Sequence, residues 1–478
     1  MPTLDMRQSP LDGPRAPAAP LVQLAYRPSG RWMPSRFNAR TVGDDGRLIL
    51  WNTLTGAINV YEAEHREAVL DLLSVDGLAA PLGRAAEYLE RRGYLVRADV
   101  DELDLFRFRR AQDQWRTDTL QLVLMASEDC NFRCVYCYEK FKHGTMLPEV
   151  RQGIRAMAEQ RAASLKEIGI MWFGGEPLYG WEAVEELAPF FAELGRREGI
   201  AVWQNMTTNG YLLDDERAGK LLSWGCRSFQ VTVDGLPEEH DRKRVGRDGS
   251  PTCEVILDNL RALHRRSEEF RVNLRVNFDH ENLPRMGAFI ESLSEDFGSD
   301  PRFKLGFHAV GRWGGPNDAQ LAVCGVREER DGLRGMRAEA READLRDDGG
   351  IERVSRPGSQ ACYAARPYNF VVSATGKLMK CTVALDEMEE NVVGQIHPDG
   401  TMEIDQARLS RWVRPHFEGD SMCQSCHLLP ACEGAACPLS RLREGYRTCS
   451  PTKGKLKMDM RATLARAPRA EHACAGAG

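Results

Sequence analysis

Three cysteines close together in the chain have the clearest chemical potential. The segment CNFRCVYC places Cys130, Cys134 and Cys137 within eight residues, directly after an apolar run that predicts a strand. Three thiolates can bind three irons of a four-iron cluster and leave the fourth iron without a protein ligand. The spacing also fits a zinc site completed elsewhere in the chain, or three buried thiols without a metal.

Polar motifs follow three of the next apolar runs. FGGEP occupies residues 173–177, TTNG occupies 207–210, and VTVDG occupies 231–235. Glycines let a backbone approach a ligand closely, and the carboxylate of Glu176 can pair with a cation. Each motif also has a plainer interpretation, because Gly-Gly-Glu-Pro and Asp-Gly are ordinary strand-end turns.

A second group of cysteines lies in the last third of the chain. Its seven members are Cys362, Cys381, Cys423, Cys426, Cys432, Cys437 and Cys449. Residues 356–450 have too little apolar periodicity for a large core, so we expect metal to hold this region together. Paired cysteines with an intervening glycine also fit a zinc ribbon.

The elements that must position these residues alternate between strands and helices over residues 119–310. Amphipathic stretches at 149–165, 180–199 and 254–269 separate short apolar runs. The six expected strands are TLQLVLMAS, EIGIMWFGG, IAVWQNMTTN, RSFQVTVDG, RVNLRVNFD and RFKLGFHAV. This pattern indicates an α/β fold with a parallel sheet, either doubly wound or an incomplete barrel. In both folds the motifs meet at the carboxyl ends of the strands, where ligands bind.

The remaining segments are smaller. The run RLILWNTLTGAINVY predicts a hairpin, and two stretches after it have helical spacing, so residues 40–118 fit a winged-helix-like module. The other expected segments are a disordered arm at 1–20, a connector at 311–355, and a tail at 451–478 that begins as a fraying helix.

The composition excludes several classes of protein. The chain has 478 residues, 42% of them hydrophobic, and a formal net charge of −6, which gives no support to nucleic-acid wrapping. No apolar run is long enough to span a membrane, and the Pro-rich start lacks a signal core. We therefore expect a cytoplasmic protein, in which 14 cysteines indicate metal rather than disulfides.

The triplet, with Tyr136 before its last cysteine, and the three motifs in this order resemble the radical S-adenosylmethionine (radical SAM) superfamily. The resemblance implies a partial (β/α)6 TIM-type barrel over residues 119–310. It also implies that Cys130, Cys134 and Cys137 hold a 4Fe-4S cluster whose open iron binds S-adenosylmethionine. Reductive cleavage of that cofactor then yields a 5′-deoxyadenosyl radical, which abstracts hydrogen from the substrate.

The same resemblance assigns cofactor contacts but no catalytic side chain. It implies that Gly174, Gly175 and Glu176 receive the methionyl ammonium. Thr232, which stands where the family usually has serine, contacts the ribose or the carboxylate, and Arg244 of the H-D-x-x-R stretch faces the carboxylate.

Four other residues near these motifs have two interpretations each. Tyr136 supports the adenine by stacking, or simply packs within its loop. Asp234 is a ligand or a turn residue. Asn277 and His308 point toward the barrel mouth, or are a satisfied strand-end side chain and a core or substrate-facing one.

The second group of cysteines resembles the SPASM extension, which carries two auxiliary 4Fe-4S clusters in peptide- and protein-modifying enzymes. By this resemblance an outer cluster has four ligands, namely Cys423, Cys426, Cys432 and Cys449. The inner cluster has only Cys362, Cys381 and Cys437, so it keeps an open iron or borrows Cys324. The four residues EGAA before Cys437 are one more than is usual, which puts its geometry in question.

Three cysteines remain outside these sets. Cys226 and Cys253 lie at the edge of a strand and at the start of a helix, where a small buried hydrophobic residue is the expected role. Cys474 lies in the tail and is expected to be incidental.

The resemblances together indicate a ribosomal-peptide (RiPP) maturase. We expect residues 40–118 to bind the leader of a precursor peptide by strand addition, and a thioether or carbon-carbon crosslink to form in the core peptide. The expected partners are that peptide and a reductant such as flavodoxin or ferredoxin, with no nucleic acid and no membrane.

Two alternatives come from other classes. A formylglycine-forming sulfatase-maturating enzyme resembles the chain in both cysteine regions, but its usual acid-base Asp after the second SPASM cysteine is Thr382 here. A non-enzymatic iron-sulfur electron-transfer or scaffold protein would need four ligands for each cluster and no ammonium receptor, which FGGEP and an open triplet disfavour.

Overall fold

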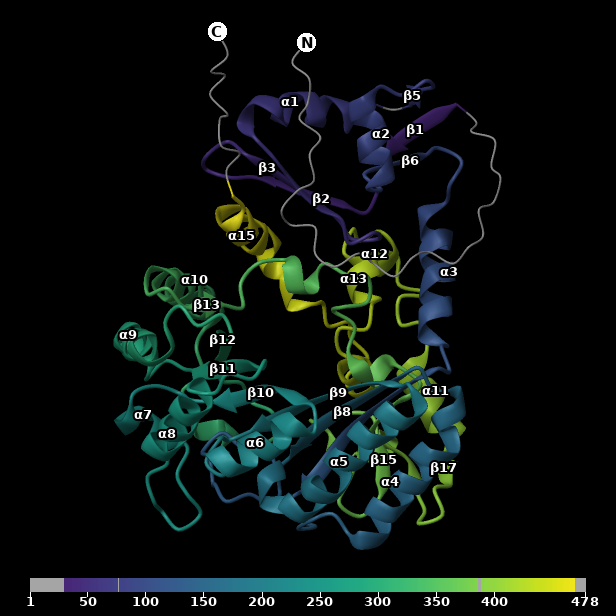
Figure 1. Ribbon diagram of the computed structural model, residues 1–478. Coiled ribbons are helices and arrows are strands. Elements are labelled where there is room, and N and C mark those ends of the chain that lie inside the picture. Colours follow the sequence, from purple (N-terminus) through teal and green to yellow (C-terminus); the bar gives the residue numbers. More distant parts are fainter. Residues whose placement is uncertain (1–29, 76, 386–387, 469–478) are drawn as a thin grey trace. The chain divides into compact units, whose positions relative to one another are not determined.

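The computed structural model describes residues 30–75, 77–385 and 388–468 (Figure 1). The expected arm at 1–20 and Cys474 lie outside these residues. The chain divides into two compact units. The first, here called the barrel unit, comprises Arg116–Asp348 and Arg366–Trp412, and the second, the terminal unit, comprises Met1–Trp115, Gly349–Ala365 and Val413–Gly478.

Six parallel strands form the centre of the barrel unit. They are β7 (Thr119–Ser127), β8 (Glu167–Gly174), β9 (Ala201–Thr208), β10 (Cys226–Thr232), β11 (Arg271–Phe278) and β12 (Phe303–Ala309). Each of β8 to β12 pairs in parallel with the strand before it, so the expected six strands are confirmed. In a doubly wound sheet the strand order reverses at one point. Here the strands pair in the order of the chain, so the connecting helices all lie on one face of the sheet and the sheet curves into a partial barrel.

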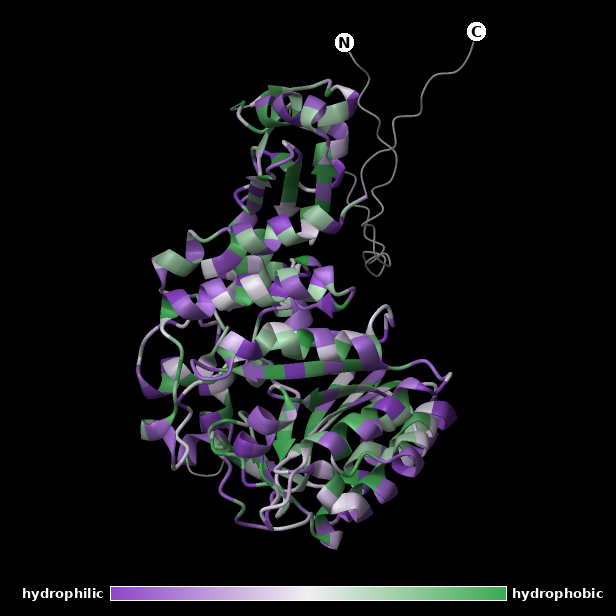
Figure 2. Cartoon of the chain, turned by 90° about the vertical axis from the view of Figure 1, so that its left-hand side faces the viewer, coloured by the Kyte–Doolittle hydropathy of each residue, from purple (hydrophilic) through white to green (hydrophobic). Residues whose placement is uncertain are grey.

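Helices connect these strands. They are α4 (Pro148–Arg161), α5 (Trp181–Glu198), α6 (Asp215–Ser223), α7 (Pro237–Lys243), α8 (Cys253–His264) and α9 (Met286–Phe297). In Figure 2 the helices carry alternating hydrophilic and hydrophobic residues. In α5, for example, Leu187, Phe191 and Leu194 are fully buried at helical spacing.

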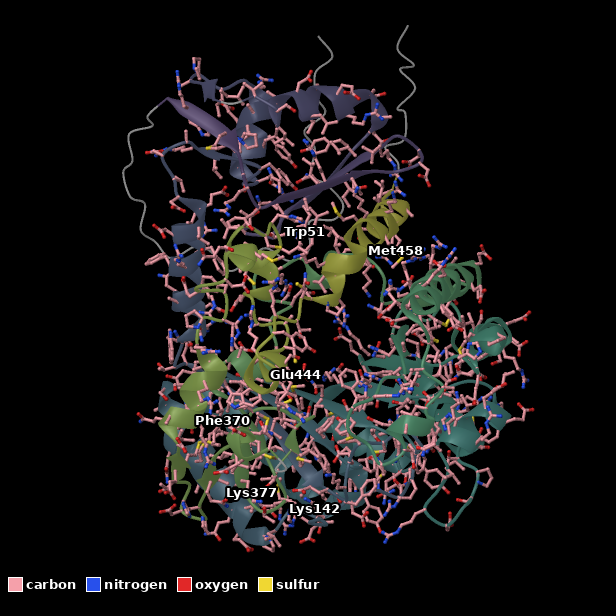
Figure 3. All side chains as sticks on the ribbon, turned by 180° about the vertical axis from the view of Figure 1, so that it is seen from behind. Trp51, Lys142, Phe370, Lys377, Glu444 and Met458 are labelled. Atoms are coloured by element: carbon pink, nitrogen blue, oxygen red, sulfur yellow. The ribbon has the colours of Figure 1, made fainter. Side chains whose placement is uncertain are left out.

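The barrel sheet extends at both edges. Beyond β12 comes β13 (Arg346–Asp347), after α10 (Val326–Glu342). At the other edge β14 (Asn369–Val372) pairs in parallel with β7, and Phe370 and Lys377 in Figure 3 mark this extension. Three antiparallel strands follow, namely β15 (Lys377–Met379), β16 (Val392–Ile396) and β17 (Met402–Ile404), and then α11 (Gln406–Val413). The region expected as one domain at 356–450 is therefore divided, because β14 satisfies the open edge of β7.

The terminal unit begins with two three-stranded sheets. One contains β1 (Arg31–Pro34), β5 (Leu78–Ala79) and β6 (Leu95–Arg97), and the other contains β2 (Asn38–Val42), β3 (Leu48–Asn52) and β4 (Ile58–Tyr61). The expected hairpin is confirmed as β3 and β4, in which Trp51 lies opposite Ile58. The helices are α1 (Ala63–Leu72), α2 (Arg84–Arg91) and α3 (Glu102–Gln114).

The end of the chain completes the core of this unit. Fully buried Trp51, labelled in Figure 3, packs in one cluster with Leu428 and with Met460 and Leu464 of α15 (Pro451–Arg466). The expected helix is thus present as α15, and burial of these side chains anchors its described part. Three short helices precede it, namely α12 (Ser421–Gln424), α13 (Leu429–Cys432) and α14 (Pro438–Arg443). No helix among the described residues has the length and apolar character that crossing a bilayer requires.

Candidate functional site

A solvent-open cavity lies at the carboxyl ends of the barrel strands and encloses about 1100 Å³. Several predicted site residues line it together, namely Cys130, Cys134, Cys137, Tyr136, Gly174, Gly175, Thr232, Arg244 and Asn277. Three predicted residues do not line it. Glu176 and Asp234 are fully buried behind its wall. His308, on β12, pairs in register with Asn277 on β11 but does not line the cavity.

The loop that carries the three thiols is fixed by backbone pairing. The amide of Arg133 donates to the carbonyl of Val245 at 2.9 Å, and the amide of Val135 donates to that of Lys243 at 2.9 Å. Asp129 accepts from the amide of Cys130 at 2.8 Å. The H-D-x-x-R stretch and the cysteine loop therefore hold each other in place.

Burial dominates the electrostatics of these thiols. It raises the pKa of Cys130 and of Cys134, and burial followed by the charge of Cys134 raises the pKa of Cys137 to about 12. Three crowded thiols of this kind become thiolates only when a cation offsets their mutual repulsion. The donor set therefore fits an iron-sulfur cluster with one open iron.

The Gly-Gly turn after β8 needs both glycines. A Cβ on Gly174, whose φ is +124°, would lie 2.1 Å from the carbonyl oxygen of Ser127. A Cβ on Gly175 would lie 2.7 Å from that of Asp129. The turn thus packs directly on the backbone that leads into Cys130, where its own backbone groups line the cavity.

The carboxylate of Glu176 accepts hydrogen bonds from other groups of the protein. It accepts from Thr208 Oγ1 at 2.7 Å, from the Asn209 amide at 2.7 Å and from the Leu178 amide at 2.9 Å. Burial raises the pKa of Glu176, and these hydrogen bonds oppose that rise. The carboxylate therefore joins the ends of β8 and β9, and its contact with a methionyl ammonium remains a prediction.

We expect Glu176→Gln to lower the free energy of unfolding by about 2–3 kcal/mol, because the amide turns an acceptor into a donor that faces donors. Thermal unfolding measures this loss. Glu149→Gln, on an exposed carboxylate in the first turn of α4, is the matched control and should cost at most about 0.5 kcal/mol through the helix dipole. Equal stability of the two variants would contradict the buried role of Glu176.

A buried polar network forms another part of the cavity wall. The hydroxyl of Tyr136 donates to Asp234 and accepts from Arg244 Nη1 at 2.7 Å and from Asn277 Nδ2 at 3.2 Å. Asp234 also accepts from the amide of Asn277 at 3.0 Å. Asp234 is thus a buried anchor for Tyr136, whose stacking on adenine remains a prediction.

Arg244 keeps a donor for a ligand. Its Nε is buried, and among the described residues nothing accepts a hydrogen bond from it. Arg244 lines the cavity beside Thr232. An unpartnered guanidinium donor in a cavity wall fits an anionic group such as the carboxylate of S-adenosylmethionine.

Several cavity residues were not predicted from the sequence, Gln230, Arg275 and Trp313 among them. Gln230 and Arg275 line the cavity two residues before Thr232 and Asn277, on the same faces of β10 and β11. Polar residues that alternate at the ends of apolar strands were the available signal. Trp313, 59% exposed, lies in a Gly-rich loop for which the sequence offered no period.

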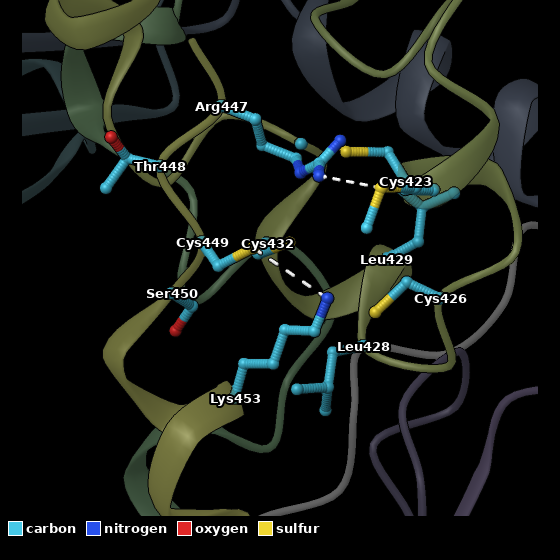
Figure 4. Close-up of a pocket in the computed structure, with 12 residues that line it drawn as sticks. Cys423, Cys426, Leu428, Leu429, Cys432, Arg447, Thr448, Cys449, Ser450 and Lys453 are labelled. Carbon is cyan, nitrogen blue, oxygen red and sulfur yellow. Dashed lines mark hydrogen bonds between the residues drawn. The ribbon is translucent and has the colours of Figure 1, made fainter.

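A second cavity lies in the terminal unit and is lined by thiols (Figure 4). It encloses about 370 Å³, and its thiols are those of the predicted outer set, Cys423, Cys426, Cys432 and Cys449. Burial raises the pKa of Cys432 to about 12, a backbone hydrogen bond from Gly434 opposes this rise, and the charges of the other three thiols add to it. The structure thus gathers these four thiols around one space, as a four-iron cluster requires.

The predicted inner set is distributed over the two units. Cys362 and Cys437 belong to the terminal unit, and Cys381 belongs to the barrel unit. Asn391 holds Cys381 by accepting from its amide at 2.8 Å and donating to its carbonyl at 2.9 Å. This set, and a contribution from Cys324, remain predictions.

The remaining thiols behave as expected. Cys226 and Cys253 have no exposed surface, in agreement with their expected role as small buried residues. Within the described ranges no group of three His, Cys, Asp or Glu side chains is arranged to bind a single metal ion.

Comparisons with known proteins agree with this geometry. Residues 125–293 match the family model described as the Radical SAM superfamily. Fe-coproporphyrin III synthase of Methanosarcina barkeri is 29% identical over 206 residues, which cover 41% of this chain and 48% of that protein. The serine-type anaerobic sulfatase-maturating enzyme of Klebsiella aerogenes is 26% identical over 175 residues, which cover 34% of this chain and 41% of that enzyme.

A solved structure shares the fold. Native anSMEcpe with bound AdoMet and Cp18Cys peptide superposes with a TM-score of 0.55 at 18% identity, covering 73% of this chain and 97% of that one. At this identity the likeness shows the fold alone. The chain spans about half the length, or less, of the two curated relatives.

Proposed function

We propose that this chain, a radical SAM enzyme with a C-terminal SPASM-type domain, is a peptide maturase. The observation that carries the proposal is the solvent-open cavity lined by three thiols, a Gly-Gly turn and Arg244, whose buried Nε has no hydrogen-bond partner among the described residues. Such a site can hold a cluster with an open iron. Beside the cluster it can bind one small molecule that carries both a cationic and an anionic group.

In this proposal Cys130, Cys134 and Cys137 hold the cluster, which supplies the electron that cleaves S-adenosylmethionine to a 5′-deoxyadenosyl radical. The backbone of Gly174 and Gly175 receives the ammonium of the cofactor. The side chains that orient its other groups are Thr232, Arg244 and Tyr136, all in the cavity wall.

A peptide substrate is supported by what similar proteins act on. One relative is named for maturing a sulfatase, and the structure with the same fold contains a bound peptide. The cavity is open and carries exposed Trp313 among its lining residues, which suits an extended chain presenting one side chain. The two sheets of the terminal unit offer edge strands, β2 and β4 among them, for a leader strand.

The proposed reaction removes two hydrogens from the peptide. The first leaves as a hydrogen atom and forms 5′-deoxyadenosine. Closure of a thioether or carbon-carbon crosslink then releases one proton and one electron. The electron passes to an auxiliary cluster held by the outer thiols or by Cys362, Cys381 and Cys437, and a flavodoxin or ferredoxin supplies the electron that starts the next cycle.

We expect a Cys- or aromatic-containing peptide encoded beside this chain, when co-expressed with it, to lose two hydrogen masses per crosslink. Mass spectrometry with fragmentation locates the bond. The matched control is co-expression with the variant in which Cys130, Cys134 and Cys137 are alanine, which should leave the peptide unchanged. An unchanged mass with the native chain would count against the peptide assignment.

A second candidate function is formylglycine formation, which the similarity to a sulfatase-maturating enzyme favours. Oxidation of a serine to an aldehyde also removes two hydrogens, so mass alone does not distinguish the two reactions. An aldehyde-reactive hydroxylamine probe does, because only formylglycine forms the oxime. Thr382 after Cys381, in place of an acid-base aspartate, favours the crosslink.

A further inference from the structure

Cationic side chains surround the thiol cavity of the terminal unit. Arg441 Nη2 lies 3.4 Å from Cys423 Sγ. Lys453 Nζ lies 3.8 Å from Cys449 Sγ, the contact dashed in Figure 4. Two of the four thiols therefore have a positive N–H donor within reach of the sulfur.

The surrounding charge is positive on balance. Arg447 also lines the cavity, and its Nη1 lies 2.7 and 2.8 Å from the two carboxylate oxygens of Asp420. Arg441 shares the same carboxylate at 3.2 Å. Lys453 has no carboxylate partner among the described residues. Two of the three cations thus share one carboxylate and Lys453 adds a further positive charge, so the cavity presents excess positive charge to whatever fills it.

This excess has a consequence for a bound cluster. Each electron that a thiolate-bound cluster accepts makes it more negative, and nearby cations stabilise the more negative state. Hydrogen bonds to the ligand sulfurs and local net charge are established determinants of cluster potential. The Arg441 side chain is only 13% exposed, so water screens its charge weakly.

We propose that Arg441 and Lys453 raise the reduction potential of the cluster held by the outer thiols and so make it an electron acceptor. The inference rests on the proposed function, which assigns Cys423, Cys426, Cys432 and Cys449 as ligands. A cluster held by these four thiols would take up the one electron that the peptide radical loses on crosslink closure, and the proton would go to solvent. Arg441 and Lys453 are positioning residues, since they contact ligand sulfurs and not the substrate.

The test is an anaerobic redox titration of the reconstituted full chain followed by electron paramagnetic resonance. The signal that is missing from Cys432→Ala identifies the outer cluster. We expect Lys453→Gln to lower the equilibrium constant for its reduction about threefold, which equals about 28 mV for one electron, because water partly screens this exposed ammonium. Lys453→Arg should retain the native potential, because it keeps the charge.

Lys457→Gln is the matched control. It removes the same charge from the same helix one turn further on, where no contact with a thiol exists among the described residues. It should move the midpoint much less than Lys453→Gln. An equal shift in both variants, or an unmoved midpoint in Lys453→Gln at full iron content, would overturn the inference.

The titration distinguishes an error in the ligand assignment from an error in the role of the cations. If Cys432→Ala keeps all of its iron and every signal, the ligand assignment in the proposed function is wrong. If Cys432→Ala loses iron but Lys453→Gln titrates like the native chain, the ligands stand and the role of the cations is wrong. Arg441→Gln should act in the same direction as Lys453→Gln, and Asp420→Asn should act in the opposite direction because it removes the offsetting charge.

Discussion

Replacing Cys130, Cys134 and Cys137 together by alanine should abolish the formation of 5′-deoxyadenosine from S-adenosylmethionine. The three thiols are the only cysteines that line the barrel cavity among the described residues, so nothing else there can hold the cluster. Because the chemical step depends on that cluster, the rate should fall to background. Anaerobic incubation with dithionite, followed by chromatography of the nucleoside, measures the loss.

The iron content of the two proteins is a second measurement of the same prediction. The native chain should bind roughly a dozen irons as three four-iron clusters, and the triple variant should lose about four of them. Cys226→Ala is the matched control, because that thiol is fully buried in the same unit but lies outside the cavity. Nucleoside formation by the triple variant, or loss of all iron from it, would rule out a separate cluster at this site.

The second large effect is expected in the terminal unit. Cys432→Ala should lower the stability of this unit far more than the loss of one buried thiol explains. Removing a small buried group costs about 1 kcal/mol, whereas a structural metal site contributes on the order of 10 kcal/mol. The segment around Cys432 consists of short helices such as α12 and α13, which cannot persist without such support.

Limited proteolysis of the reconstituted chain measures this effect. Cleavage within residues 413–450 should accelerate in Cys432→Ala, and in the native chain after iron is removed with a chelator. Cys253→Ala removes a fully buried thiol from the barrel unit and should leave the pattern unchanged. If chelation changes nothing in the native chain, the four thiols do not hold a cluster that the fold requires.

The sequence predicted the barrel well because its signals are local. Six apolar runs bounded by turn residues match β7 to β12, and the three motifs fall at their carboxyl ends. The side chains that face the cavity were only partly found. Gln230 and Arg275 follow the same alternation as Thr232 and Asn277, so a stricter use of strand periodicity would have included them.

Other features depend on contacts between distant segments. The division of residues 356–450 follows from β14 pairing with β7, and the anchoring of α15 follows from burial of Met460 and Leu464. The cations beside the outer thiols come from α14 and α15, and their distances to sulfur are not encoded in any local pattern.

The sequence by itself therefore determined where the barrel strands lie along the chain, the three thiols in one loop and the glycines at the end of β8, because each of these is a short-range pattern. Only the tertiary structure decided that the carboxylate of Glu176 is used to join β8 and β9, while the buried Nε of Arg244 has no acceptor among the described residues. The reason is physical. Residue type fixes which hydrogen bonds a side chain can make, but packing fixes which of them the protein has already satisfied and which remain for a ligand.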